Sequence, residues 1–314
     1  MSHAATLGAI ATRRAVVRVR RRQREWGMAL AMLAPAFVLL GVWTYAPLLE
    51  ALWLSFHEWN LLPTIPPAYV GLDNYARLLE LRELHRAAWN TVIYTLGLLP
   101  LTVALPLVVA LLAGGVGGWL GDLYRALIFV PMVIAPIVVA IVWRWLLNPS
   151  HGVVNALITG LGFPPVAFLQ DPSIAIWSII FITGWKLIGF SAIIFSAAIA
   201  DVDRGLMEAA RLDGASEFQI ARHVIVPLIR PALLLVTMLT LLHGAQWSFV
   251  YINVLTQGGP LLATTNLYYL LWDYGFGNFA IGWATAAGML LLAVYAVVAA
   301  ACLYVMRRHA APVE

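Results

Sequence analysis

Charged side chains return to an otherwise apolar second half of the chain in one stretch, MEAARLDGASEFQIARHVIVPLIRP, at residues 207–231. A helix is expected to end at Gly214, and Ser216 can cap a second helical piece that Pro227 closes. Two short helices of this kind offer charges and a small apolar face to a partner, so the predicted chemistry is ionic docking. A solvated connector is the alternative that the residues alone leave open. The charged residues are Glu208, Arg211, Asp213, Glu217, Arg222 and Arg230. The apolar face expected on the second piece consists of Phe218, Ala221 and Ile225.

Polar and aromatic side chains also interrupt the apolar stretch LLLVTMLTLLHGAQWSFVYINVLT, residues 233–256. Polar groups inside a membrane span are costly and often line a pathway. Hydroxyls and amides can hydrogen-bond a polyol, and aromatic rings can stack on the apolar faces of a sugar. Polar packing between helices, at about 0.6–2 kcal/mol per contact, is the alternative. The predicted substrate face contains Thr240, His243, Trp247 and Tyr251, at helical spacing, with Gln246 and Asn253 beside it.

Lys186 is the third notable group, because it lies in the middle of another apolar stretch. A cation at that depth costs about 2.5–3.5 kcal/mol or more unless it is paired. It is included in the predicted pathway, where it could attract an anionic ligand such as a sugar phosphate. A structural or general gating role is the interpretation that we favour for it.

Long apolar segments must position these groups. The 314 residues are 62% hydrophobic and 11% charged, against about 25% charged in soluble domains. About 20 apolar residues suffice to cross a membrane as a helix. The chain is therefore predicted to be an all-α integral membrane protein with six transmembrane helices. They are expected at about 27–55, 88–114, 125–147, 173–199, 231–256 and 280–305.

The basic residues predict the orientation. Seven of the 19 precede the first span, and six spans place fourteen on that side against three in the opposite loop, which favours cytoplasmic termini. The net charge of +4 is thus topological and does not indicate nucleic-acid binding. The first helix is expected to be uncleaved, and the lone Cys302 excludes a disulfide within the chain. The predicted organisation is an Arg-rich tail (1–26), a membrane domain (27–306) with a cytoplasmic loop at 201–230, and a cytoplasmic tail (307–314).

Several motifs resemble one protein family. EAARLDGASEFQIARHVIVP resembles the signature E-A-A, three residues, G, nine residues, I-x-L-P of permease subunits of ATP-binding-cassette importers. WKLIGF, VLTQGGP and YVGLDNYARLL are similar to segments of the carbohydrate-uptake type, of which the maltose- and glycerol-phosphate-type first subunits are examples. The resemblance covers about residues 28–306. The signature positions are Glu208, Ala209, Ala210, Gly214, Val224, Val226 and Pro227, with valine twice in place of isoleucine and leucine.

The resemblance implies a type I importer permease fold in which this loop is a coupling helix, docked in a groove of an ATPase. Glu208 and Arg211 would make charged contacts, Ala209 and Ala210 would allow close approach, and Gly214 would permit the bend. Asp213 belongs to the family-like DGAS segment. The implied partners are a second homologous permease, a homodimer of ATPase subunits, an external binding protein, a sugar substrate and lipid, in the inner membrane of a prokaryote. ATP and Mg would bind to the ATPases; this chain would bind no cofactor and catalyse nothing.

One departure bears on the substrate. The family often has F-D-x-V/I-Y before the VLTQGGP segment, whereas this chain has Val250 and Asn253 at the Asp and Tyr positions. The identity of the sugar is therefore left open.

Two other classes of protein compete. An ion-coupled secondary transporter would need no ATPase, but the predicted spans contain no buried carboxylate pair. A membrane enzyme would need a catalytic motif, and neither H-E-x-x-H nor G-x-S-x-G occurs. The DVD segment at 201–203 is a weak metal cue that fits the lead-in to the loop better, so no metal site is expected.

Overall fold

The computed structural model describes residues 28, 30–62, 64–113 and 118–309, and the chain divides into two units, one ending at Leu54 and one beginning at Ser55. The first unit contains one helical span, Leu30–Leu54, in which the π-helical turn η1 (Gly41–Tyr45) precedes α2 (Ala46–Leu54). Most of its side chains are exposed apolar groups. This agrees with the predicted first span.

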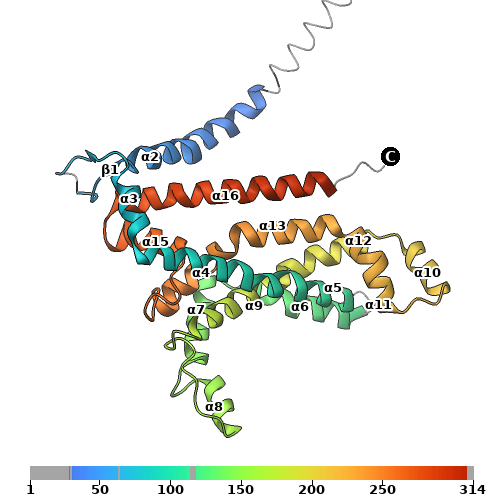
Figure 1. The fold of residues 1–314 in the computed structure, drawn as a ribbon. Helices are drawn as coiled ribbons and strands as arrows, with labels where there is room; N and C mark the ends of the chain where they lie inside the picture. Colours follow the sequence, from blue (N-terminus) through green and yellow to red (C-terminus); the bar gives the residue numbers. More distant parts are fainter. Residues whose placement is uncertain (1–27, 29, 63, 114–117, 310–314) are drawn as a thin grey trace, which may run out of the picture. The chain divides into compact units, whose positions relative to one another are not determined.

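The second unit is helical apart from one very short antiparallel hairpin, β1 (His57–Glu58) and β2 (Ala68–Tyr69), in which His57 faces Tyr69. The helices and π-helical turns (η) follow one another along the chain as coloured in Figure 1. In the first half of the unit they are α3 (Asp73–Glu80), α4 (Arg82–Leu99), η2 (Pro100–Ala104), α5 (Leu105–Ala113), α6 (Gly118–Val133), α7 (Pro136–Leu146) and α8 (Val153–Gly160). They continue with α9 (Ala175–Ala200), α10 (Arg204–Leu212), α11 (Glu217–Ile220), η3 (Ala221–Ile225), α12 (Val226–Leu228), α13 (Arg230–Trp247), α14 (Phe249–Tyr251), η4 (Ile252–Thr256), α15 (Leu267–Trp272), η5 (Asp273–Gly277) and α16 (Ile281–His309).

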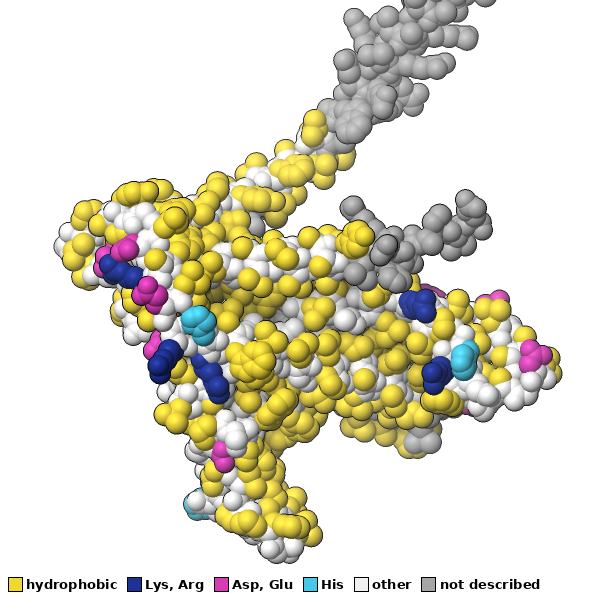
Figure 2. Space-filling model, viewed as in Figure 1, with side chains coloured by type: hydrophobic (Ala, Val, Ile, Leu, Met, Phe, Trp, Pro, Cys, Tyr) yellow, Lys and Arg dark blue, Asp and Glu magenta, His cyan; other side chains and the backbone are white. Residues whose placement is uncertain are grey.

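Five helices of the described residues are long and apolar enough to cross a membrane, and a bent pair, α6 with α7, makes six. α9 is the most enclosed of them and packs against α4, α5, α6 and α13. On the face shown in Figure 2, charged side chains gather toward the ends of the second unit and an apolar surface lies between them. This distribution fits a helix bundle surrounded by lipid. The prediction of an all-α membrane protein is confirmed.

The third predicted span, 125–147, was wrong in one respect, because it is not a continuous helix. The helix axis bends by 103° between its two halves. Pro131 lies inside α6 and Pro136 opens α7, with Ala135 extended between the halves (ψ 135°). A proline has no N–H to give to the preceding turn and forces the residue before it out of the helical region.

The two ends of the second unit have separate small cores. At the α10 end, formed by residues 200–230, a cluster of Val202, Ile220, Ile225 and Ile229 is buried. At the α15 end, formed by residues 256–281, Leu78, Leu270 and Tyr274 contribute to another.

Asn90 fixes the backbone of the α15 end. Its Nδ2 donates to the carbonyls of Leu262, Ala263 and Thr265 at 3.0, 3.1 and 2.8 Å, and the Tyr94 hydroxyl donates to Thr264 O at 3.1 Å. One side chain of α4 thus holds a loop that follows far later in the chain.

Candidate functional site

The loop at 204–228 is built from two helices with their own caps. The Asp203 carboxylate accepts a hydrogen bond from Gly205 N (2.8 Å) and starts α10. α10 ends before Gly214, which adopts φ +80°, a conformation that suits glycine because it has no Cβ. After the turn, Ser216 Oγ accepts from Gln219 N (3.3 Å) while Gln219 Oε1 accepts from Ser216 N (2.8 Å). This capping box satisfies two otherwise free N–H groups. The predicted helix end and cap are both confirmed.

An ion pair braces the turn. Arg211 Nε lies 2.8 Å from Glu217 Oε1, and a second guanidinium nitrogen lies 3.2 Å from Oε2. The hydrogen bonds from Arg211 lower the pKa of Glu217, and those to Glu217 raise the pKa of Arg211. Arg211 was expected to make a charged contact with a partner protein. Its guanidinium is instead paired with Glu217 within the loop.

The inward side of the loop is anchored to the bundle. Ile220 and Ile225 are buried with Val202 and Ile229, and the neighbouring ends of α5, α9 and α13 pack against this cluster. Met207 and Ala210 are the α10 residues that join it. α10 is therefore packed, through this cluster, against three long helices.

The outward side of the loop is free of the bundle. Glu208 and Ala209 are exposed, so of the two signature alanines only Ala209 faces outward. Leu212 and Phe218 are 90% and 72% exposed, and sequence reasoning did not assign Leu212 any role. Its signal was an apolar residue at the end of an otherwise polar helical face.

The expected shared face of Phe218, Ala221 and Ile225 was wrong. Phe218 is exposed whereas Ile225 is buried. The π-helical turn η3 begins at Ala221 and changes the residues per turn, so 3.6-residue spacing does not hold across it.

Two other residues that were predicted to take part in coupling, Asp213 and Pro227, lie on either side of the turn. Asp213 forms the C-cap of α10, and Pro227 is in the first turn of α12.

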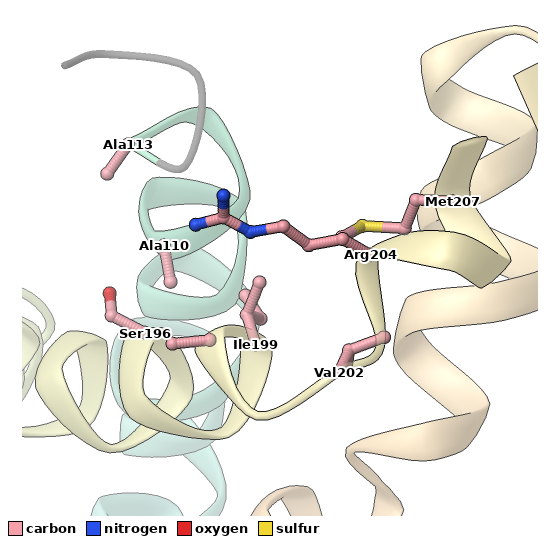
Figure 3. A pocket seen from close by; sticks show the side chains of 8 residues that line it. Ala110, Ala113, Ser196, Ile199, Val202, Arg204 and Met207 are labelled. Atoms are coloured by element: carbon pink, nitrogen blue, oxygen red, sulfur yellow. The ribbon is translucent and has the colours of Figure 1, made fainter.

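A cavity of about 260 Å³ separates the start of α10 from the ends of α5 and α9. Figure 3 shows the Arg204 side chain extended across it toward the side of Ala110 and Ala113. Its walls are mostly small, from Ala110, Ala113, Ser196, Ile199, Ala200 and Val202.

The predicted substrate face of α13 is divided by the structure. Thr240 is buried, and its hydroxyl lies 2.9 Å from that of Thr102 on η2. Tyr251 is also buried, in the main core cluster. Both therefore face the interior of this chain. The helical span runs on through α14 to Tyr251, and the π-helical turn η4 begins only at Ile252, so it displaces the half-buried Asn253 from the regular helical spacing.

Three residues of that prediction remain together on an accessible surface. His243 Nδ1 lies 3.0 Å from Gln246 Oε1, and the His243 ring stacks on Trp247 with centroids 5.9 Å apart. Gln246 is exposed and the other two are half-buried. We call His243, Gln246 and Trp247 the polar patch. It combines hydrogen-bonding groups with an aromatic face.

Lys186 has its hydrogen-bond partners on α6 and not in the polar patch. It is buried, and its Nζ donates to the carbonyls of Pro131 (3.1 Å) and Met132 (2.8 Å) at the end of α6. Among the described residues, no group of three or more His, Cys, Asp or Glu side chains could hold a metal ion.

Residues 106–312 match the model of a family described as binding-protein-dependent transport system inner membrane component. The chain belongs to this family. It is 31% identical over 264 residues to the trehalose/maltose transport system permease protein MalF of Thermococcus litoralis, covering 82% of this chain and 88% of MalF. It is 31% identical over 292 residues to the diacetylchitobiose uptake system permease protein NgcF of Streptomyces coelicolor, covering 88% and 82%.

Its fold is similar to that of a chain in the crystal structure of a bacterial alginate ABC transporter in complex with an alginate pentasaccharide-bound periplasmic protein. The TM-score is 0.80 at 26% identity, over 92% of this chain and 96% of that one. The resemblance predicted from the motifs and the importer permease fold are confirmed. As an inner membrane component of a binding-protein-dependent transport system, the chain is the membrane-embedded subunit and not the hydrolase, and the nucleotide belongs to a separate ATPase.

Proposed function

We propose that the chain is the permease subunit of an ATP-driven sugar importer, that it forms half of the translocation pathway, and that ATPase subunits dock on its loop at 204–227. The loop is the observation that carries this proposal. It is exposed on one side and packed on the other against the ends of α5, α9 and α13.

The exposed side of the loop suits a protein partner. Glu208 offers a charge, Ala209 permits close approach of a backbone, and Leu212 and Phe218 offer apolar anchors. Because two caps, one ion pair and a glycine turn hold the loop in shape, a push on α10 moves the whole loop. Asp213 and Gly214 define the corner at which the two helices meet.

The pathway is proposed to run past the polar patch. A sugar presents hydroxyls to Gln246 and His243 and an apolar face to Trp247. The named substrates of both relatives, and the alginate of the related transporter, are carbohydrates, which supports this class of cargo. Thr240, Tyr251 and Asn253 remain proposed pathway residues of lower rank, because two are buried within the chain.

The proposed orientation follows the basic residues. Both termini and the α10 end lie in the cytoplasm, and the α15 end faces outward. A second homologous permease completes the pathway, two identical ATPase subunits bind ATP and Mg, and an external binding protein delivers the sugar. The loops at 56–87 and 257–279 are the proposed contacts for the binding protein. ATP-driven closure of the ATPases opens the pathway outward, and hydrolysis returns it to the inward-open state.

The test is ATPase activity of the complex in lipid, assembled with partners encoded by neighbouring genes and scanned with binding protein and a sugar panel. Stimulation by one sugar is the expected result and identifies the cargo. Failure of any ATPase to co-purify would overturn the proposal and favour an ion-coupled transporter that acts alone.

A further inference from the structure

The break between α6 and α7 creates a specific shortage of hydrogen-bond donors. In a continuous helix, the carbonyls of Pro131 and Met132 would accept from the N–H groups four residues later. For Met132 that residue is Pro136, which has no N–H. For Pro131 it is Ala135, which is extended and outside the helix. Two carbonyls are therefore left without partners inside the membrane, where an unsatisfied backbone group is costly.

Lys186 supplies both missing donors. Its Nζ lies 3.1 Å from Pro131 O and 2.8 Å from Met132 O, and the side chain is only 7% exposed. The C-terminal end of a helix carries a partial negative charge, which favours a cation beside it. No carboxylate in the described part of the chain pairs with Lys186, so these carbonyls are its counter-charge.

α9 also contacts the second half of the broken span. The Trp143 ring on α7 packs edge-on against Trp185 and Phe181, with centroids 5.6 Å away in each case. On the α6 side, Gly189 allows close approach, because the carbonyl of Ile128 occupies the space that a Cβ would need. α9 thus contacts both arms of the bend, and Lys186 is the one charged side chain of α9 itself.

The position of α7 matters for the pathway. α7 packs against α14 and η4, the segments that directly follow the polar patch at the end of α13. We propose that Lys186 is a positioning residue: it caps the broken end of α6, holds the third span bent, and so fixes α7 against the end of the pathway helix. Its effect on transport rests on the proposed function, whereas its effect on the bend does not.

The bend is measured directly by spin labels on the purified protein in nanodiscs. Cys302 is replaced by serine, and labels are placed at the exposed positions Leu127 and Ile141, one on each arm. A continuous helix would separate these two positions by about 21 Å along its axis. In the protein that retains Lys186, the distance between the two labels is expected to have one narrow distribution, centred at a shorter distance than in a straight helix.

Lys186→Met is expected to broaden the distribution, because the prolines still break the helix while the cap that fixes the angle between its two arms is lost. Lys186→Arg, which also donates to carbonyls, is expected to restore the narrow distribution. If Lys186→Met fails to insert, Lys186→Gln is used; its shorter side chain reaches one carbonyl at most and should give an intermediate width. An unchanged distribution in the variant used overturns the proposal.

Uptake by the assembled complex gives the second readout. Loss of the cap is expected to lower the maximal rate about tenfold while KM changes less than about twofold, as expected for a group that does not touch substrate. A rise in KM confined to anionic substrates, with the distances unchanged, would make Lys186 a ligand for anionic cargo and overturn the positioning role. If no variant, including the unaltered chain, supports uptake, the proposed function fails while the distance result still decides the role of Lys186.

Discussion

The capped turn of the 204–228 loop and the buried Thr240 of α13 differ in where their side-chain partners lie along the chain. In the loop, Asp203 bonds Gly205, Ser216 bonds Gln219 and Arg211 bonds Glu217, all within six residues. In the fifth span, Thr240 bonds Thr102, 138 residues away. When the partners of an element are local, its geometry can be predicted from adjacent residues. Which side of a helix is buried in a bundle depends on other helices, and the sequence of that helix alone does not predict it.

The strongest test of the loop half of this comparison is the double change Glu208→Ala with Gly214→Val. A β-branched residue at φ +80° adds about 1–3 kcal/mol of strain, and the loss of Glu208 removes an exposed charge. Sugar-stimulated uptake is expected to fall on the order of 100-fold while ATPase activity continues, uncoupled from transport. Parallel assays of uptake and ATP hydrolysis in proteoliposomes measure this.

Gly162→Val is the matched control. Gly162 also has a positive φ (+86°) and open space around its Cβ position, but it lies in the loop after α8. It is expected to carry similar strain without uncoupling. Normal uptake by the loop double variant, or equal uncoupling by the control, would contradict the proposed coupling role of the loop.

The polar patch is the next test. Trp247→Ala removes the ring that stacks on His243 and is expected to raise KM for the sugar about tenfold, with little change in basal ATPase activity. Trp89→Ala, at an exposed tryptophan of α4, serves as the comparison and should leave KM unchanged. Equal effects of the two substitutions on KM would show that the patch does not meet the substrate.

A smaller effect is expected for the buried member of the predicted face. Thr240→Val leaves the Thr102 hydroxyl without its interhelical partner and should lower the free energy of unfolding by about 1 kcal/mol. In a thermal-melt double-mutant cycle, adding Thr102→Val should cost less than the sum of the two single changes. Thr285→Val, whose hydroxyl bonds only its own helix, is the control. A rise in KM without loss of stability would return Thr240 to the pathway.

The smallest effect concerns the exposed Arg211–Glu217 pair. Because the pair lowers the pKa of Glu217, its contribution is present above the ordinary carboxyl pKa and is lost as the pH falls through the lowered value. Hydrogen exchange of the peptide covering 207–219, corrected for the intrinsic rate, should therefore show falling protection below about pH 4. Glu217→Gln is expected to show the reduced protection at neutral pH, and Asp213→Asn should not. A flat corrected profile in the unaltered chain would mean that the caps alone hold the turn.

Much of the fold follows from residues that act locally. Apolar length predicted the spans, Gly214 and Ser216 predicted the turn and cap, and the signature spacing predicted the family. The bend of the third span was also encoded locally, in Pro131 and Pro136, but an apolar segment of span length was taken as one straight helix.

The candidate site was less predictable because its decisive contacts are distant. The role of Lys186 depends on carbonyls 54 and 55 residues earlier, and the burial of Tyr251 depends on its place in the main core cluster. Helical spacing assumes 3.6 residues per turn, and the π-helical turn η3 breaks that assumption within the predicted face of Phe218, Ala221 and Ile225.

The Asn90 clasp has a consequence for how the protein is made. Its acceptors, the carbonyls of Leu262, Ala263 and Thr265, lie 172 to 175 residues later in the chain. At about 5–20 residues per second, synthesis of that interval takes roughly 10 to 35 s. During that time the Asn90 amide has none of these partners, so this contact between α4 and the later loop cannot form. A chain that ends before residue 262 therefore contains five of the six spans but none of the three acceptors of Asn90.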